Sequence, residues 1–269
     1  MSAVSLLVVV DPAARRVDAE SVRIAKDVLS AGAAAKICFP EGPEEIERAF
    51  AHRGAKRPVL VGDDLALLRT VRLLLRERSL ADTALSVVPV GPAAGLALTR
   101  RLGVPQDTVA AARAVLDGVE KRQGLLTDDS GGVVLGGLRV PAGHEAPAGP
   151  ADGSVWPRLR ERVHRLTGLA APCAPKQASV PTALRVEADG VLLADLDHPV
   201  HQVEVHPGET GGLAEVLVAD GRTPVRASAR SVRISGADFR YRADAVIGGP
   251  VRTRTWTAQP DAWRLTLPR

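Results

Sequence analysis

The sequence predicts a two-part fold, in which a mostly parallel α/β domain precedes an antiparallel β-sandwich domain. The first 118 residues alternate continuous apolar runs with amphipathic helical segments, which is typical of β-α units with right-handed crossovers. From Thr182 onward, short apolar runs are separated by turn signals such as Asp189-Gly190, which favours a sandwich of short strands. We therefore place the domains at 1–118 and 119–269, with 141–181 as a Pro/Ala/Gly-rich insert.

The elements of the first domain follow from the period of its apolar residues. Val4–Val10 is a continuous apolar run, as expected for a strand covered on both faces, and Asp18 is placed to cap the helix that comes next. Further strands are expected over 34–39, 58–61 and 84–88, and helices over 18–31, 43–52, 65–78, 93–101 and 107–116. Ligands of such folds bind beyond the carboxyl ends of the strands, so the loops after the first, third and fourth strands are candidate site loops.

The second domain is expected to consist of strands and turns. A hairpin is expected around 128–132, followed by the insert, which we expect to be loop or disordered apart from one short helix over 156–166. Later strands are expected over 184–187, 191–196, 200–205, 214–218, 225–234, 239–246, 251–256 and 263–267.

Composition excludes several classes of protein. The 35 basic and 31 acidic residues leave a net charge of only +4, and with one Tyr and three Phe there is little surface for stacking nucleobases, so no nucleic-acid partner is expected. Two cysteines provide neither a disulfide framework nor a zinc site. No apolar run reaches the roughly 18 residues of a membrane span. We expect a cytoplasmic protein without a transmembrane segment, for which peripheral membrane contact stays open.

Several short motifs, most of them at the ends of the predicted strands, resemble those of a known protein family. The chain reads Val8-Val-Val-Asp-Pro12, Val61-Gly-Asp-Asp-Leu65, Pro89-Val-Gly-Pro-Ala-Ala-Gly-Leu-Ala97 and Arg101-Leu-Gly-Val-Pro105, and later Tyr241-Arg-Ala-Asp-Ala-Val246 and Trp263-Arg-Leu-Thr-Leu-Pro268. In order and spacing these segments resemble the motifs of diacylglycerol kinases and related bacterial lipid kinases. That family has Asn-Pro, Gly-Gly-Asp-Gly-Thr, Pro-Leu-Gly-Thr-Gly-Asn-Asp-Phe-Ala and Leu-Gly-Ile-Pro, and then an Asp-Gly-Glu turn and a closing strand. The resemblance covers nearly the whole chain, with a gap in the middle.

The resemblance implies a nucleotide site and a lipid kinase reaction that uses ATP and magnesium. It places Gly62, Asp63 and Gly91 at the nucleotide and Asp244 near the metal or base position. The same residues are also common at strand-to-helix corners for reasons of shape alone, and that alternative stays open.

The departures from the family motifs affect the residues that would bind the phosphates and support phosphoryl transfer. Val61, Asp64 and Leu65 replace two glycines and a hydroxyl, and Pro92 has no N–H to donate. We expect the carboxylate of Asp64 to face the polyphosphate, where one like charge at about 4 Å costs roughly 4 kcal/mol at an effective dielectric near 20. The hypothesis is therefore a catalytically degenerate relative that binds a ligand or regulates, so whether the chain is an enzyme is left open. The alternatives are an active lipid kinase that uses Asp63 and Asp244, and a protein–protein scaffold.

Two further groups of residues are candidate sites. His198, His201 and His206 with Asp195 and Asp197 suggest a metal site, but odd spacings on a strand separate His201 from the other two. The acidic pairs Asp63-Asp64 and Asp128-Asp129 are read as solvated turns, and no metal is assigned.

The late strands carry Arg226, Arg230, Arg233, Arg240, Arg242, Arg252 and Arg254. These form either the solvated face of a sheet or a basic platform for an anionic lipid headgroup or acidic partner. A nucleotide and an anionic lipid are thus the candidate partners.

Overall fold

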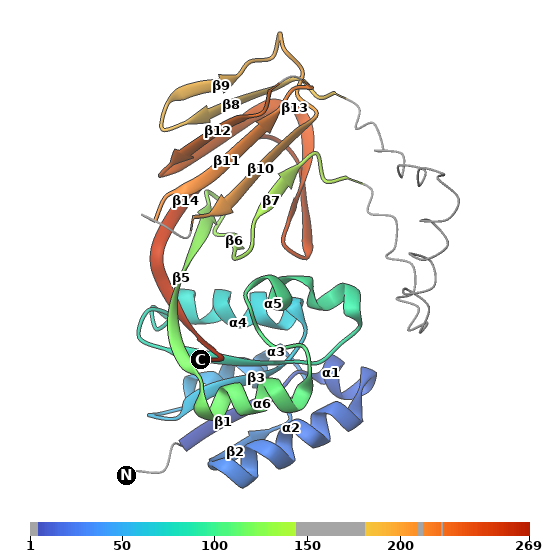
Figure 1. The fold of residues 1–269 in the computed structure, drawn as a ribbon, viewed down its shortest axis with the longest axis vertical. Helices are drawn as coiled ribbons and strands as arrows, with labels where there is room; N and C mark the ends of the chain where they lie inside the picture. The colour runs from blue at the N-terminus through green and yellow to red at the C-terminus, as the bar shows by residue number, and fades with distance from the viewer. Residues whose placement is uncertain (1–4, 144–180, 209–211, 222) are drawn as a thin grey trace, which may run out of the picture.

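The computed structural model describes residues 5–143, 181–208, 212–221 and 223–269, and it consists of two unlike halves (Figure 1). An α/β half with parallel strands comes first in the chain, and an antiparallel β half comes second. Strands β5 (Val119–Asp128) and β14 (Val246–Leu267) run through both halves and join them. The fold class predicted from the sequence is confirmed. The helix expected over 156–166 and nearly all of the insert lie outside the described residues.

The α/β half is built on four parallel strands in the order β2-β1-β3-β4. The strands are β1 (Ser5–Val10), β2 (Ala34–Cys38), β3 (Arg57–Gly62) and β4 (Ala84–Pro89). The helices are α1 (Pro12–Val17), α2 (Ala19–Gly32), α3 (Pro43–Ala51), α4 (Asp64–Arg76), α5 (Ala97–Arg101) and α6 (Thr108–Asp117), with a 3-10 turn η1 over Ala93–Leu96. Sequence reasoning missed only α1, a short helix that Asp11 caps and Pro12 opens.

Helices cover both faces of this sheet, which explains the uninterrupted apolar run of β1. Leu6 and Val8 belong to a core that includes α2 and α6, whereas Leu7 and Val9 belong to a core that includes α3 and α4. Successive strand residues point to opposite faces, so a strand covered on both sides must be apolar at every position.

The β half is antiparallel, with the strand order β12-β11-β10-β7-β13-β14. Its remaining strands are β6 (Val133–Val134), β7 (Leu138–Val140), β8 (Leu184–Ala188), β9 (Val191–Ala194), β10 (Gln202–Pro207), β11 (Ala214–Ala219), β12 (Val225–Ala229) and β13 (Ser231–Ala243). The predicted turn at Asp189-Gly190 is confirmed, since both residues have positive φ, 48° and 82°, as a two-residue hairpin requires.

The last strand differs from the prediction. The two strands expected over 251–256 and 263–267 are one strand, β14, which is bent by a register shift between Gln259 and Trp263. The polar residues at this bulge look like a turn in the sequence, which is why one strand was predicted as two. Beyond the bulge, β14 pairs in parallel with β4, and Trp263 and Leu265 enter the core of the α/β half. The boundary at residue 118 falls just after α6 and stays a prediction.

Candidate functional site

The residues expected at the nucleotide do come together, at the carboxyl ends of β3 and β4. Asp63 caps α4, because its Oδ1 accepts a hydrogen bond from Ala66 N at 2.9 Å. A Cβ on Gly62 would lie 2.9 Å from Ala66 Cβ and 3.1 Å from Asp11 Cβ, and a Cβ on Gly91 would lie 3.1 Å from Asp63 Cβ. Each glycine therefore allows a close approach of neighbouring side chains, and the space beside both is filled by the protein itself.

Asp64 does not face this turn, so the expectation that its carboxylate opposes a polyphosphate is wrong for this structure. Asp64 is 2% exposed, and its two carboxylate oxygens accept hydrogen bonds from Leu98 N at 2.8 Å and Thr99 N at 2.9 Å. Burial raises the pKa of Asp64, and the two backbone N–H groups oppose that rise only in part. The side chain thus caps the start of α5 from within the protein.

The loop after β4 has few backbone donors left for a ligand. Pro92 has no N–H, and the N–H of Gly95 bonds to Pro92 O at 2.8 Å within the 3-10 turn. The N–H groups of Leu98 and Thr99, further along the same segment, donate to Asp64. A phosphate cradle depends on N–H groups that point at the ligand, and here the chain uses several of them for its own structure.

Asp244 lies in the β half, where it lines a cavity between the two halves and backbone N–H groups hold its carboxylate. Its carboxylate accepts hydrogen bonds from the backbone N–H groups of Leu135 (2.7 Å), Gly136 (2.8 Å) and Gly137 (3.0 Å). Burial raises the pKa of Asp244, and these three donors oppose the rise. The residue lies in a turn with a positive φ of 49°, a conformation that Asp tolerates better than most residues. Asp244 thus fixes the connection between β6 and β7.

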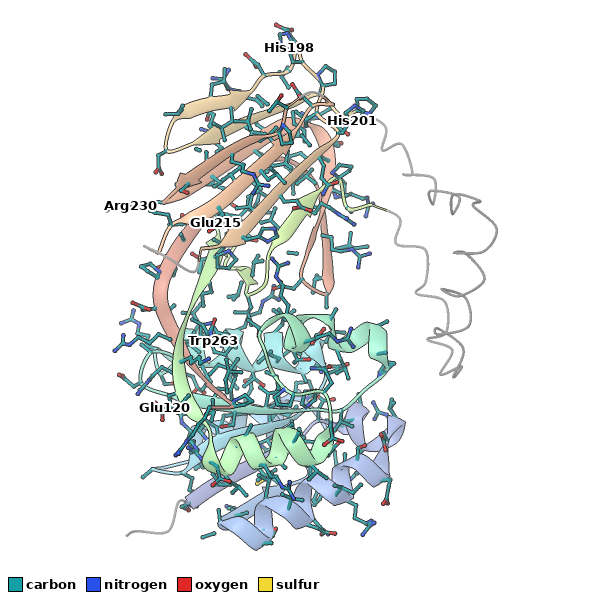
Figure 2. All side chains as sticks on the ribbon, in the orientation of Figure 1. Glu120, His198, His201, Glu215, Arg230 and Trp263 are labelled. Carbon is teal, nitrogen blue, oxygen red and sulfur yellow. The ribbon has the colours of Figure 1, made fainter. Side chains whose placement is uncertain are left out.

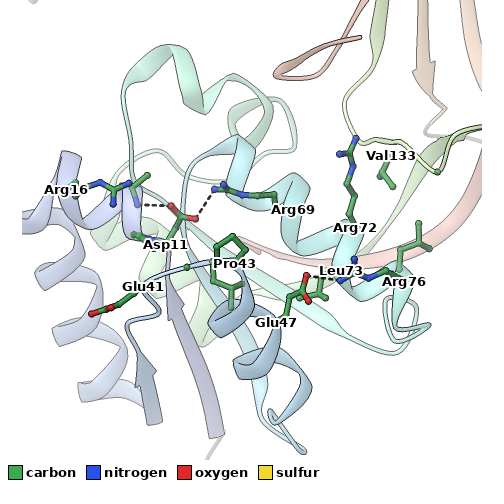
Figure 3. A pocket seen from close by; sticks show the side chains of 16 residues that line it. Asp11, Arg16, Glu41, Pro43, Glu47, Arg69, Arg72, Leu73, Arg76 and Val133 are labelled. Atoms are coloured by element: carbon green, nitrogen blue, oxygen red, sulfur yellow. Dashed lines mark hydrogen bonds and ion pairs between the residues drawn. The ribbon is translucent and has the colours of Figure 1, made fainter. Parts of the chain in front are cut away.

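A cavity of about 750 Å³ lies at the carboxyl ends of β1 and β2 (Figure 3). Its walls come from the loop after β1, the start of α3, one face of α4 and the turn before β6. Four arginines line it: Arg16, Arg69, Arg72 and Arg76. Arg69 Nη2 lies 2.9 Å from Asp11 Oδ2, and Arg76 Nη2 lies 2.7 Å from Glu47 Oε1. Apolar side chains complete the lining, among them Pro43, Ile46 and Leu73.

Sequence reasoning missed this arginine-lined cavity. It named the loop after the first strand, which does line the cavity, but not the loop after β2 or the exposed face of α4, which form much of the rest. A signal was present, because Arg69, Arg72 and Arg76 recur at helical spacing on the face of α4 opposite Leu67 and Leu74.

The other candidate groups are dispersed. Figure 2 shows His198 and His201 at the end of the β half far from the α/β half, whereas His206 bonds to Arg101 of α5 at 3.1 Å. Over the described ranges of the chain, no group of three or more His, Cys, Asp and Glu side chains could hold a metal ion. Asp129 pairs with Arg254 at 2.7 Å.

The late arginines differ in their surroundings. Arg252 pairs with exposed Asp238 at 3.2 Å, and Arg242 lines a cavity between the halves. Arg226, Arg230, Arg233 and Arg240 are exposed. No helix in the described segments is long and apolar enough to cross a membrane.

The chain thus combines an α/β half, which has a ligand-sized cavity at its strand ends, with an antiparallel β half. No family model matches the chain, and no curated protein matches it. Among solved structures, a diacylglycerol kinase from Bacillus anthracis str. Sterne is similar over 99% of this chain and 98% of its own, with a TM-score of 0.70 and 14% identity. A second structure, of a provisionally named diacylglycerol kinase from that organism, has a TM-score of 0.70 and 13% identity over the same shares. At such identities the likeness shows the fold, which is diacylglycerol-kinase-like.

Proposed function

We propose that this chain is a ligand-binding protein on a diacylglycerol-kinase-like fold that does not transfer phosphoryl groups. The observation that carries the proposal is the environment of Asp244, the carboxylate expected to act as base or metal ligand. Three backbone N–H groups already hold it. A general base must accept a proton from its substrate, and a carboxylate so engaged would have to break its own structural contacts to do so.

The residues present do not fit magnesium. Mg²⁺ binds through carboxylate oxygens in a near-octahedral arrangement, and phosphoryl transfer depends on the metal to neutralise charge. The three carboxylates of the motif positions, Asp63, Asp64 and Asp244, cap α4, the start of α5 and the β6–β7 connection respectively. We therefore derive no step through Mg-ATP.

The arginine-lined cavity supports a nucleotide-type ligand, in which a flat aromatic base is joined through a sugar to phosphate. Its volume of about 750 Å³ lies within the usual range of ligand pockets, roughly 300–1,000 Å³. Guanidinium groups bind phosphate through two parallel hydrogen bonds, and apolar residues such as Ile46 and Leu73 offer a surface for a ring.

Titration with ADP tests this assignment. We expect ADP to bind equally well with and without Mg²⁺, because the cavity supplies positive charge from its own arginines. The Arg72→Gln variant should bind about tenfold to a hundredfold more weakly, since a hydrogen bond to a charged group is worth about 1.5–3 kcal/mol. Arg113→Gln, an exposed arginine of α6 outside the cavity, is the matched control and should bind like wild type. Binding that requires Mg²⁺, or that Arg72→Gln leaves unchanged, would contradict the assignment.

The second candidate function is an active lipid kinase. The observation that favours it is the direction of Asp64, whose side chain turns into α5 and leaves the Gly62-Asp63 turn without the extra charge that the sequence suggested. Measurement of lipid-dependent turnover of Mg-ATP separates the two candidates.

A further inference from the structure

A cavity of about 290 Å³ lies in the β half, between β9 on one side and β11 and β12 on the other. Its lining includes His198, which Figure 2 shows at the end of the β half far from the α/β half. It shares no lining residue with the arginine-lined cavity. Its occupant is therefore independent of the nucleotide-type ligand proposed for that cavity.

Two strands at this cavity have an unpaired edge in the described part of the chain. β9 is hydrogen-bonded only to β8, and β12 only to β11. Such an edge presents N–H and C=O groups that can pair with a further strand, so edge strands are commonly protected by a charged residue or a proline. β12 has Arg226, whereas β9 reads Val191-Leu-Leu-Ala194 and has neither. β9 is thus the edge that is less protected against an added strand.

Exposed apolar side chains gather at the same place. Nine large hydrophobic side chains are exposed in the described segments, and four of them are Val191, Leu192, Leu196 and Val225. Leu192 and Val225 line the cavity together with Val218, which belongs to the core of the β half. An apolar patch on a protein surface commonly marks a place where another molecule binds.

The charge around this patch indicates the kind of molecule. The cavity lining contains Asp195 and Asp220 but no Lys or Arg. Arg185 approaches Asp195 to 3.8 Å without entering the lining. Membrane surfaces that contain anionic lipids are negative and would repel these carboxylates. The sign of the charge favours a protein segment that has basic residues beside its apolar ones.

A second copy of the chain fits this edge less well. β9 is preceded by Asp189 and followed by Asp195. An antiparallel pairing of β9 with itself would bring opposite ends of the strand together, and with them Asp189 of one copy and Asp195 of the other. Like charges that meet across a strand pair are destabilising. The partner is therefore expected to be a different protein.

We propose that β9 binds an extended segment of a partner protein, which adds to the sheet as a further strand and covers Leu192 and Val225. In this mode of recognition the paired backbones provide affinity, and the side chains that enter pockets provide specificity. The segment is apolar at alternate positions, because alternate side chains of a strand point to one face. Lys or Arg at its ends would lie near the carboxylates of the cavity.

A library of short random peptides displayed on phage tests the proposal. Selection on the full-length chain, with counter-selection on Leu192→Lys, should enrich peptides that alternate apolar residues and end in Lys or Arg. A synthetic peptide of the enriched sequence should bind Leu192→Lys at least about tenfold more weakly than wild type, because the variant removes an apolar contact and adds a charge at the strand edge. Val17→Lys is the matched control, since Val17 is an exposed valine of α1, and it should bind the peptide like wild type.

Two readouts separate strand addition from non-specific adhesion. Hydrogen exchange in the segment 190–197 should slow when the peptide is bound, because a new strand protects the amides of β9. Peptides that are N-methylated at one set of alternate residues should lose binding, whereas methylation of the other set should be tolerated. Val191→Lys provides a second variant in case Leu192→Lys melts at a lower temperature, because Val191 is 63% exposed and contributes little to the core.

Several outcomes would overturn the proposal. No enrichment over the counter-selection would do so, as would a peptide that still binds when both sets of residues are N-methylated. Binding of wild type but not Leu192→Lys to vesicles of phosphatidylcholine and phosphatidylglycerol would assign the patch to a membrane. A dimer in sedimentation equilibrium that Leu192→Lys dissociates would assign it to a second copy. None of these outcomes affects the ADP titration, so the proposed function is tested separately.

Discussion

Replacement of Asp244 by Ala should lower the free energy of unfolding by at least about 4 kcal/mol. The substitution leaves the N–H groups of Leu135, Gly136 and Gly137 without their acceptor, and each buried unsatisfied donor costs about 1–3 kcal/mol. It also places a residue with a Cβ and no polar side chain at a φ of 49°, which costs about 1–2 kcal/mol. The change is measured by urea unfolding monitored by circular dichroism.

Two variants separate these contributions. Asp261 has the same φ of 49° but is exposed, so Asp261→Ala reports the backbone cost alone, about 1–2 kcal/mol. Asp244→Asn keeps one acceptor oxygen and should be less destabilised than Asp244→Ala. If Asp244→Ala instead unfolds like wild type, the three hydrogen bonds carry no stability, and the structural role assigned to Asp244 fails.

Replacement of Trp263 by Ala should destabilise both halves together, by about 3–5 kcal/mol. Trp263 is fully buried, and it lies where β14 leaves the β half and enters the core of the α/β half (Figure 2). Because β5 and β14 run through both halves, we expect one cooperative transition. The helical circular dichroism signal and the fluorescence of Trp256, which is buried in the β half, should shift to the same lower midpoint.

The control for this prediction is Leu196→Ala. Leu196 is 47% exposed, so the substitution should change the free energy of unfolding by less than about 0.5 kcal/mol. A Trp263→Ala variant in which only the helical signal moves to a lower midpoint would mean that the halves unfold independently, contrary to the shared strands.

Much of the α/β half could be predicted because its signals are local. The apolar run of β1, the cap at Asp18 that accepts Ser21 N, and the leucine face of α4 are each contained within a few turns of chain. The continuous strand β14 was divided in two because its bulge is polar in sequence, and whether such residues form a turn or a bulge is decided by their pairing with β5.

The candidate site was predictable as a set of loops but not in its contacts. The partners of Asp64 lie 34 and 35 residues further along the chain, and the donors to Asp244 lie 107 to 109 residues before it. The direction of each carboxylate depends on how α5 and the β6–β7 connection pack, which no local pattern encodes. Arg242 was noted in the sequence as one of a row of arginines, but its neighbour Arg139 on the adjacent strand is set by strand pairing alone.

The most direct measurement of the central claim is lipid-dependent release of ADP from Mg-ATP by wild-type protein in mixed micelles containing diacylglycerol. Since the carboxylates at the motif positions are engaged in backbone contacts, we expect a rate equal to that of micelles without protein, with Asp244→Asn giving the same result. Saturable ADP release that requires both diacylglycerol and Mg²⁺, and that a folded Asp244→Asn variant lacks, would contradict the account and identify the chain as a kinase.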